Sequence, residues 1–196
     1  MQLVNRKSKM IKPWKTIRSK LIGDFRIFKL RSDTSVNPRT GKEHDFFVLD
    51  SVNWVNVIAI TPDRQIVMVE QYRHGSNTVE LEIPGGMMDA GETDPVATAV
   101  RELREETGYA GGNARLLGKV WSNPAILNNR TYTVLIENCQ LKHGVEFDSG
   151  EDISTRLVPV AEIPQLVADE IIGHPLVVVA LYYFDLWQRG IKRIAD

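Results

Sequence analysis

Residues 100–109 read "VRELREETGY" and gather three glutamates and two arginines just before a glycine. On an α-helix the side chains of Glu102, Glu105 and Glu106 are neighbours, because residues three and four apart share one face. Adjacent carboxylates repel one another, so a purely structural helix gains little from this pattern. A divalent cation turns such repulsion into binding, and Mg²⁺ and Mn²⁺ prefer oxygen ligands of this kind. The stretch therefore indicates a metal site, with a solvated acidic helix face as the alternative.

Local signals around this stretch predict a helix over residues 95–107. Asp94 is a suitable N-cap, Pro95 fits the first helical position, and Gly108 suits a left-handed residue after the last turn. At about 100° per residue, one narrow stripe of this helix is expected to be buried: Val96, Val100, Leu103 and Thr107. The three glutamates project from the opposite side, which we expect to face away from the core.

A glycine-rich loop precedes the predicted helix. The segment "TVELEIP", residues 78–84, alternates like a strand and runs into Gly85 and Gly86. Glycines in this place let the backbone approach a ligand closely and expose carbonyl groups to a metal. The loop and the helix are therefore expected to work as one binding unit.

The loop and helix together give a spaced motif. In order it contains Gly86, five residues, Glu92, eight residues, and then Arg101-Glu102-Leu103-x-Glu105-Glu106-x-Gly108-Tyr109. This run resembles the Nudix box, GX5EX7REUXEEXGU, in which U is a bulky apolar residue, and every fixed position is matched. One departure is the spacing between Glu92 and Arg101, which is eight residues and not seven. The additional residue falls around "TDP", at the loop-to-helix junction, where it can be absorbed without rotating the carboxylates.

The rest of the chain has a mixed α/β pattern. The resemblance implies a Nudix α/β/α sandwich with a mixed sheet, preceded by a small N-terminal β-rich domain. We expect residues 1–50 to form this β-rich segment, a dimerisation element, and residues 51–196 to form the hydrolase domain. Strands are expected at 25–36, 44–52, 54–60, 65–73, 78–84, 114–121 and 130–140, and helices at 95–107, 161–170 and 175–188.

Composition narrows the class of protein. The 196 residues are 43% hydrophobic and 25% charged, which is typical of a globular domain. Their formal net charge of -1 gives no overall electrostatic attraction to nucleic acid. The longest apolar run, residues 175–184, is shorter than the roughly 20 residues of a membrane span. Cys139 is the only cysteine, so no intrachain disulfide is possible, which favours a reducing cytoplasm. We expect neither a membrane nor a nucleic acid as partner.

The first twenty residues are locally basic. They contain no acidic residue and carry these cations: Arg6, Lys7, Lys9, Lys12, Lys15, Arg18 and Lys20. We interpret them as a solvated terminus that leads into the first strand, because no aromatic interleaving suggests base stacking. An arm drawn to a polyanion is the alternative. No apolar segment follows that would make a secretory signal.

Residues outside the box narrow the resemblance. "VEQYR" at 69–73, "ELEIPGG" at 80–86 and Pro124, fifteen residues after Tyr109, are similar to the ADP-ribose pyrophosphatase branch. Enzymes of that branch hydrolyse nucleoside diphosphate sugars and are usually homodimers whose N-terminal parts contribute to the partner's site. The resemblance therefore implies Mg²⁺-dependent cleavage of ADP-ribose first and GDP-mannose-type sugars next, with Mn²⁺ as the other metal. The expected products are a nucleoside monophosphate and a sugar phosphate.

The resemblance also implies roles for individual residues. The implied metal ligands are the carbonyl of Gly85 and the carboxylates of Glu102, Glu105, Glu106 and Glu151. Arg101 is expected to orient the carboxylates, paired with Glu92, because an arginine cannot serve as a base at neutral pH. Glu105 and Arg101 thus count among the catalytic residues, together with the general base.

Two substrate contacts and the base come from other segments. Arg73 is expected to contact the diphosphate, since its fork suits phosphate oxygens. Glu82 matches a position that contacts the nucleoside, and a strand-edge glutamate is its alternative. For the base, the loop at 147–154 offers Asp148, Glu151 and Asp152, of which Glu151 aligns best with the family's outlying acid. Ser149 stands where a second glutamate of the family would be, and a solvated acidic loop is the alternative.

Three other functions remain open at this stage. One is a Nudix hydrolase of nucleoside triphosphates or dinucleoside polyphosphates, which shares the box but not the Pro124 offset. Another is a binding module that senses a nucleotide without cleaving it, although such proteins typically lose box glutamates that this chain keeps. The last is a nucleic-acid or decapping role, which would use the basic N-terminus.

Overall fold

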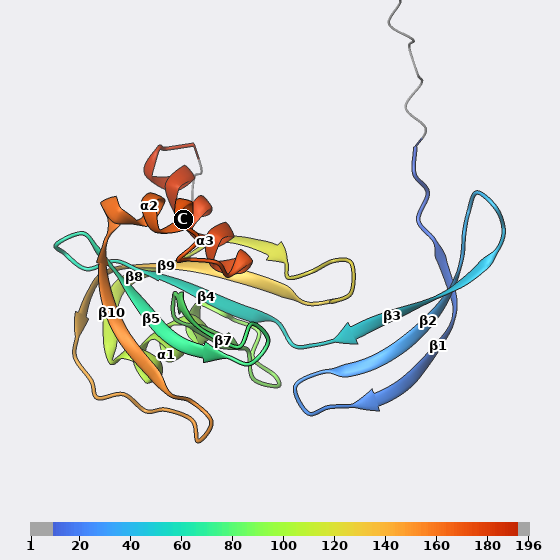
Figure 1. Ribbon diagram of the computed structural model, residues 1–196, viewed down its shortest axis with the longest axis horizontal. Coiled ribbons are helices and arrows are strands. Elements are labelled where there is room, and N and C mark those ends of the chain that lie inside the picture. The colour runs from blue at the N-terminus through green and yellow to red at the C-terminus, as the bar shows by residue number, and fades with distance from the viewer. Residues whose placement is uncertain (1–9, 192–196) are drawn as a thin grey trace, which may run out of the picture. The chain divides into compact units, whose positions relative to one another are not determined.

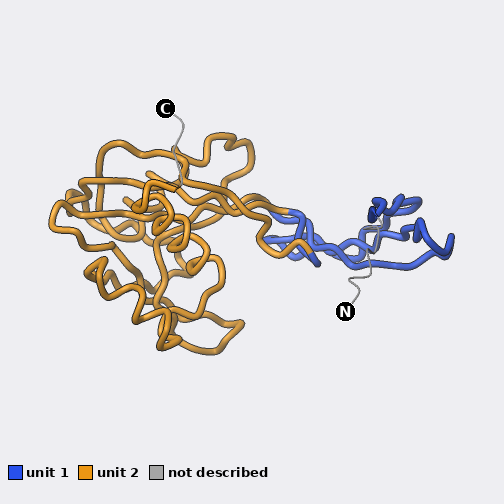
Figure 2. The backbone as a smooth tube through the Cα atoms, turned by 90° about the horizontal axis from the view of Figure 1, so that it is seen from above, with its two compact units in different colours: residues 1–51, 125–128 blue, residues 52–124, 129–196 orange. Residues whose placement is uncertain are grey.

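The computed structural model describes residues 10–191, and the chain divides into two compact units. Figure 2 colours them separately: the first holds the chain up to Ser51 together with residues 125–128, and the second holds 52–124 and the chain from 129 onward. Three of the basic residues noted above, Arg6, Lys7 and Lys9, lie outside the described residues.

The first unit is built on a three-stranded antiparallel sheet in the order β1 (Lys15–Asp24), β2 (Lys29–Val36), β3 (Glu43–Asp50). Residues 125–128 join it, because the amide of Leu49 donates to the carbonyl of Ile126 at 2.8 Å. The sequence predicted the second and third strands but not β1. The charges of Lys15, Arg18 and Lys20 do not oppose this strand, since its residues are almost all exposed and β2 supplies the backbone partners.

The second unit contains two sheets, visible in Figure 1. One has the order β10 (Ile153–Pro159), β5 (Gln65–Arg73), β6 (Thr78–Glu82) and is antiparallel. The other has the order β7 (Gly85–Met87), β4 (Trp54–Ala59), β9 (Arg130–Leu141), β8 (Tyr109–Trp121). It is mixed, because β4 runs parallel to β9 and antiparallel to β7.

The helices of this unit begin and end where local chemistry dictates. They are α1 (Pro95–Thr107), α2 (Ile163–Ala168) after a short 3-10 turn (Val160–Glu162), and α3 (Pro175–Gln188). In α1 the amide of Val96 donates to the capping side chain of Asp94 at 2.9 Å, and Gly108 ends the helix at a φ of 71°. These bounds confirm the predicted helix. None of the helices in residues 10–191 has the length and apolar character needed to cross a membrane.

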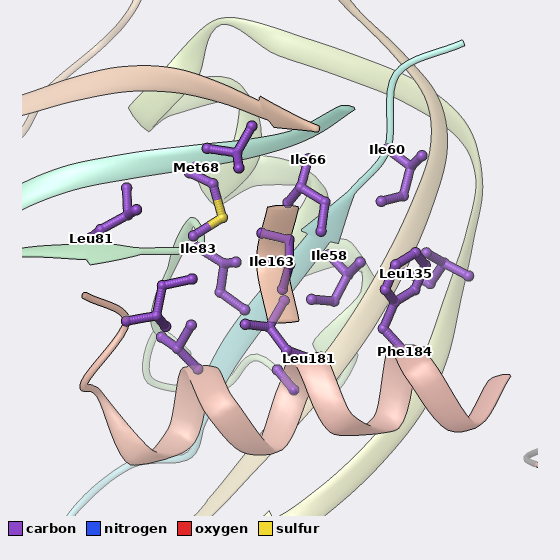
Figure 3. Close-up of a cluster of buried hydrophobic side chains, with 14 of the residues drawn as sticks. Ile58, Ile60, Ile66, Met68, Leu81, Ile83, Leu135, Ile163, Leu181 and Phe184 are labelled. Carbon is purple, nitrogen blue, oxygen red and sulfur yellow. The ribbon is translucent and has the colours of Figure 1, made fainter. Parts of the chain in front are cut away.

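Two hydrophobic clusters occupy opposite faces of the strands. Successive strand residues point to opposite sides, so in β4 Ile58 packs into one cluster and Val57 into the other. The first cluster is covered by α3, which contributes Leu181 and Phe184 (Figure 3). The second is covered by α1 through Leu103. The predicted α/β/α sandwich is thereby confirmed.

The predicted orientation of α1 is wrong in one respect. Val100, expected in the buried stripe, is 44% exposed, whereas Glu102 and Glu106 are buried at 8% and 4% exposure. The cause is tertiary: the side of α1 that carries Leu103 packs on the second cluster, and β7 with its glycines lies against the glutamates. The spacing of apolar residues along the helix could not predict that the glutamates are buried, because the residues that cover them belong to a strand outside the helix.

Candidate active site

Two buried glutamates of α1 lie beneath the glycines of β7. A Cβ built on Gly86 would lie 2.6 Å from the carboxylate carbon of Glu102, so the absence of a side chain makes room for that carboxylate. The amide of Gly85 donates to Glu106 Oε2 at 3.0 Å. The pairing of β7 with β4 places both glycines, with Gly86 opposite Val55. The strand therefore fixes the two carboxylates that the helix presents.

Burial makes these carboxylates hard to ionise in the absence of a cation. Desolvation raises the pKa of Glu102 to about 7, although the charge of Arg101 opposes the shift. Desolvation likewise raises the pKa of Glu106 to about 8, against the opposing hydrogen bond from Gly85, and the charge of Glu102 raises it further. Two such groups side by side bind a cation favourably, because a cation offsets both their mutual repulsion and their lost hydration.

Arg101 is the centre of the ion pairs around these acids. Its Nη1 lies 2.9 Å from Glu102 Oε1 and 2.9 Å from Glu105 Oε2. Its Nη2 lies 3.5 Å from Glu92 Oε2. That Glu92 oxygen also accepts hydrogen bonds from the Asp89 amide at 2.8 Å and the Thr98 hydroxyl at 2.9 Å. The additional residue of the box is thus accommodated ahead of the helix, with Glu92 still beside Arg101.

Glu105 differs from the other two glutamates of the box. Its carboxylate contacts Arg101 at 2.9 Å and Arg104 at 3.2 Å. Within residues 10–191, no three side chains of His, Cys, Asp or Glu are arranged together to hold a metal ion. The donor set that fits a hard divalent cation therefore combines the carboxylates of Glu102 and Glu106 with a backbone oxygen of β7, for which Gly85 is the candidate.

Arg73 and Glu82 form a two-point ion pair on neighbouring strands. Arg73 Nε and Nη2 donate to the two carboxylate oxygens of Glu82 at 2.6 and 2.9 Å. The Glu82 side chain is 4% exposed and that of Arg73 42%. The hydrogen bonds to Glu82 raise the pKa of Arg73 above its ordinary value, and the charge of Glu106 adds to the effect. The guanidinium therefore lies within electrostatic reach of the buried acids.

The acidic loop before β10 brings Glu151 toward the same cluster. The charge of Glu151 raises the pKa of both Glu102 and Glu106. Within the loop, the Glu151 amide donates to the Asp148 carbonyl at 2.9 Å, and the Asp148 amide donates to Glu151 Oε2 at 2.9 Å. Of the three acids considered for the general base, Glu151 is the one whose charge acts on both buried glutamates of α1.

One pair of charged residues near the site was not anticipated. Arg104, at a variable position of the box, pairs with Glu146, whose nearest carboxylate oxygen is 3.1 Å away. The two residues are 42 positions apart. Spacing along a helix relates only residues a few positions apart, so no signal in the sequence indicated this contact.

Comparison with known proteins finds a family match, similar sequences and a similar solved structure. Residues 51–177 match the NUDIX domain family. The chain is 31% identical over 179 residues to the methanol dehydrogenase activator of Bacillus methanolicus, covering 91% of this chain and 95% of that protein. It is 29% identical over 133 residues to the ADP-ribose pyrophosphatase of Bacillus subtilis, covering 67% and 71%. A crystal structure of an ADP compounds hydrolase superposes with a TM-score of 0.81 at 21% identity, over 93% of this chain and 98% of that one.

Proposed function

The chain belongs to the Nudix family of hydrolases, and we propose on that premise that it cleaves the pyrophosphate bond of nucleoside diphosphate sugars. ADP-ribose is the first substrate and GDP-mannose-type sugars are the next. The observation that carries the proposal is the pair of buried carboxylates, Glu102 and Glu106, beneath the glycine strand. The ADP-ribose pyrophosphatase and ADP-sugar pyrophosphatase among its relatives support the substrate class.

We propose Mg²⁺ as the metal, with Mn²⁺ as its substitute. Glu102, Glu106 and the carbonyl of Gly85 would hold it, and Glu105 would join as a further oxygen ligand. Glu151, the other ligand that the resemblance implies, is assigned to proton transfer instead. When bound, the metal neutralises diphosphate charge and makes a water molecule easier to deprotonate. The raised pKa values of Glu102 and Glu106 support this assignment, because a dication favours the ionised forms that burial disfavours.

The chain's own residues supply the remaining steps. Arg101 orients Glu102 and Glu105 through contacts of 2.9 Å each. Glu151 accepts the proton of the attacking water as general base, a role that its electrostatic reach to the cluster supports. Water attacks one phosphorus, the bond from that phosphorus to the bridging oxygen breaks, and the other phosphate leaves. The products are a nucleoside monophosphate and a sugar phosphate.

We propose that Arg73 binds the diphosphate and that Glu82 orients it. The fork of Arg73 suits phosphate oxygens, and 42% of its side chain is exposed for such a contact. Glu82 is almost completely buried and both of its oxygens accept from Arg73. This geometry favours a positioning role for Glu82 over the nucleoside contact expected from the resemblance.

The test is hydrolysis across a substrate panel with Mg²⁺ or Mn²⁺, with products separated by chromatography. The panel contains ADP-ribose, GDP-mannose, ADP-glucose, NADH, diadenosine polyphosphates and nucleoside triphosphates. We expect the diphosphate sugars to be cleaved fastest. Faster cleavage of triphosphates or dinucleoside polyphosphates would instead support the alternative Nudix substrate class. No turnover with either metal would support a binding module.

A second candidate function is stimulation of an alcohol dehydrogenase. It is favoured by the similarity to a methanol dehydrogenase activator, which extends over 91% of this chain and 95% of the relative. The test adds the purified protein to a methanol dehydrogenase assay, with Glu106→Gln as the matched control. Stimulation by the wild-type protein but not by the variant would show that the effect needs the hydrolase site.

We also propose that the first unit is a dimerisation element and that the protein acts in the cytoplasm. The β1–β3 sheet leaves large apolar side chains open to solvent, among them Ile22 at 49% and Phe47 at 58% exposure, which line the same hollow of the sheet. Such a patch is usual where a partner covers it. Light scattering should give the mass of a dimer, and Ile22→Glu with Phe47→Glu should shift it to a monomer. A cytoplasmic compartment is supported by the single cysteine, Cys139, which is buried.

A further inference from the structure

Arg104 reaches from α1 to a loop far along the chain. Its Nη1 donates to Glu146 Oε1 at 3.1 Å and its Nη2 to Glu146 Oε2 at 3.4 Å. The same Nη2 also donates to Glu105 Oε1 at 3.2 Å. A guanidinium that holds both oxygens of one carboxylate restricts that carboxylate in direction as well as in distance. Arg104 thus connects the helix of the buried glutamates to the segment that follows β9.

Backbone hydrogen bonds attach the same segment to the end of α1. The carbonyl of Gly108 accepts from the amides of Lys142 and His143, both at 3.0 Å. The carbonyl of Glu105 accepts from the Glu146 amide at 2.8 Å. These acceptors belong to the last turn of the helix and the residue after it, where carbonyls have no partner within the helix. The segment therefore satisfies the end of α1 while the helix fixes the path of the segment.

The loop beyond Glu146 is held at its far end by β10. Ile153, the first residue of β10, pairs with β5 and is 7% exposed. Between these two anchors, the reciprocal hydrogen bonds of Asp148 and Glu151 close a turn. A loop with both ends fixed has few conformations, so moving one anchor alters the position of Glu151 directly.

We propose that Arg104 is a positioning residue that acts through Glu146 to place Glu151 beside the buried glutamates of α1. The inference rests on the proposed function for its catalytic consequence, since it assumes that Glu151 acts in the reaction. Its structural part, the anchoring of residues 142–152, depends only on the contacts described above. Arg104 contacts Glu105 but neither of the buried glutamates, Glu102 and Glu106.

The structural part is tested by hydrogen–deuterium exchange on Arg104→Ala. We expect amides of residues 146–152 to exchange about five-fold faster than in the wild-type protein, a size typical of losing an exposed, geometrically favourable ion pair. Arg189→Ala is the matched control, because it removes a comparably exposed pair, Arg189 with Asp185 at 3.0 Å, on α3. Unchanged exchange at 146–152 in Arg104→Ala would overturn the proposal whatever the activity.

The catalytic part is tested by kinetics on the preferred diphosphate sugar. We expect Arg104→Ala and Glu146→Ala each to lower kcat about five-fold with little change in KM, and the double variant to lower it no further. In a Glu151→Gln background the effect of Glu146→Ala should disappear, because Glu146 then has no catalytic group left to position. Glu146→Ala is used here because Arg104 also contacts Glu105, at 3.2 Å. A persisting effect in that background, or an unchanged kcat, would overturn the positioning role.

The two failures can be told apart. If the wild-type protein cleaves none of the diphosphate sugars but exchange at 146–152 rises in Arg104→Ala, the proposed function has failed and the anchoring stands. If the wild-type protein is active and neither exchange nor kcat responds to Arg104→Ala, the positioning proposal has failed and the function stands.

Arg104→Lys should recover part of the kcat that Arg104→Ala loses, since lysine restores the positive charge without the two-point contact of the guanidinium.

Discussion

Gly86 lies directly against the carboxylate of Glu102, so closely that a Cβ on the glycine would be 2.6 Å from the carboxylate carbon. The atoms that would clash are the far end of a side chain and not backbone, so the fold can yield by moving the carboxylate. A side chain at position 86 should therefore displace the Glu102 carboxylate more than it destabilises the fold.

Gly86→Ala should consequently lower turnover far more than stability. We expect kcat to fall by about 100-fold or more, since displacing a catalytic group by about 1 Å has effects of this size, with a small change in the unfolding midpoint. Steady-state kinetics and thermal unfolding check the two expectations. Gly112→Ala is the control, because nothing lies within 4 Å of the Cβ it would add. Near-normal turnover in Gly86→Ala would show that catalysis does not depend on the position that Gly86 allows the Glu102 carboxylate to take.

Gly85→Ala should behave in the opposite way. Its added Cβ would lie 2.2 Å from the backbone oxygen of Val55, which cannot move without disturbing the β4–β7 pairing. We expect a loss of stability of about 2 kcal/mol or more, as for other strongly destabilising core substitutions. Denaturant unfolding measures it. A variant as stable as the wild type would show that β7 can shift away from β4 at little cost.

Glu106→Gln should remove activity and yet stabilise the metal-free protein at alkaline pH. Burial raises the pKa of Glu106 from 4.5 to about 8. Since the folded-state value is the higher one, ionisation disfavours the fold, and stability falls as pH rises from about 4.5 through 8. The amide cannot ionise, so this loss should be absent from the variant. We expect a gain of about 2–4 kcal/mol at pH 9 in EDTA.

Urea unfolding of both proteins at pH 5 and pH 9 checks this expectation. At pH 5 the two should differ little, because Glu106 is then protonated in the folded protein. The hydrogen bond from the Gly85 amide can be kept by the amide oxygen of the variant. Equal stability of the two proteins at both pH values would contradict the burial of an ionisable Glu106 in the metal-free state.

Mg²⁺ should stabilise the protein more at pH 8.5 than at pH 6. Metal ligands must be deprotonated, and the pKa values of about 7 for Glu102 and about 8 for Glu106 mean that protons compete with the metal at the lower pH. Bound ligand at 100 times its dissociation constant stabilises by about 2.7 kcal/mol. Thermal unfolding with and without MgCl₂ at the two pH values measures the difference, and Glu106→Gln supplies the control. A shift independent of pH would count against these two glutamates as ligands.

Arg73→Lys should weaken substrate binding even though it keeps the positive charge. A lysine cannot reproduce the two-point contact of Arg73 with Glu82 or offer a fork to phosphate oxygens. We expect KM to rise by more than about ten-fold, since a hydrogen bond to a charged group contributes about 1.5–3 kcal/mol. Arg156→Lys, in an exposed pair with Glu70, is the control and should leave KM unchanged. A normal KM in Arg73→Lys would remove Arg73 from the substrate site.

Much of this protein follows from local sequence. The bounds of α1 were predictable because Asp94, Pro95 and Gly108 act within one turn of the residues that they cap. The strands at 54–59 and 65–73 were predictable from apolar runs bounded by turn residues. The spacing of the box indicated the family, since it depends only on the order of residues along the chain.

Tertiary structure decided which groups are buried and what each charge contacts. Glu102 and Glu106 face inward because β7 pairs with β4 and brings its glycines over α1, an arrangement that helical spacing does not contain. Arg73 meets Glu82 because β5 and β6 are adjacent strands. Arg104 meets Glu146 across 42 positions because the loop after β9 returns to the end of the helix. Local propensity acts within a few residues, whereas desolvation and ion pairing depend on whatever the folded chain brings within a few ångströms.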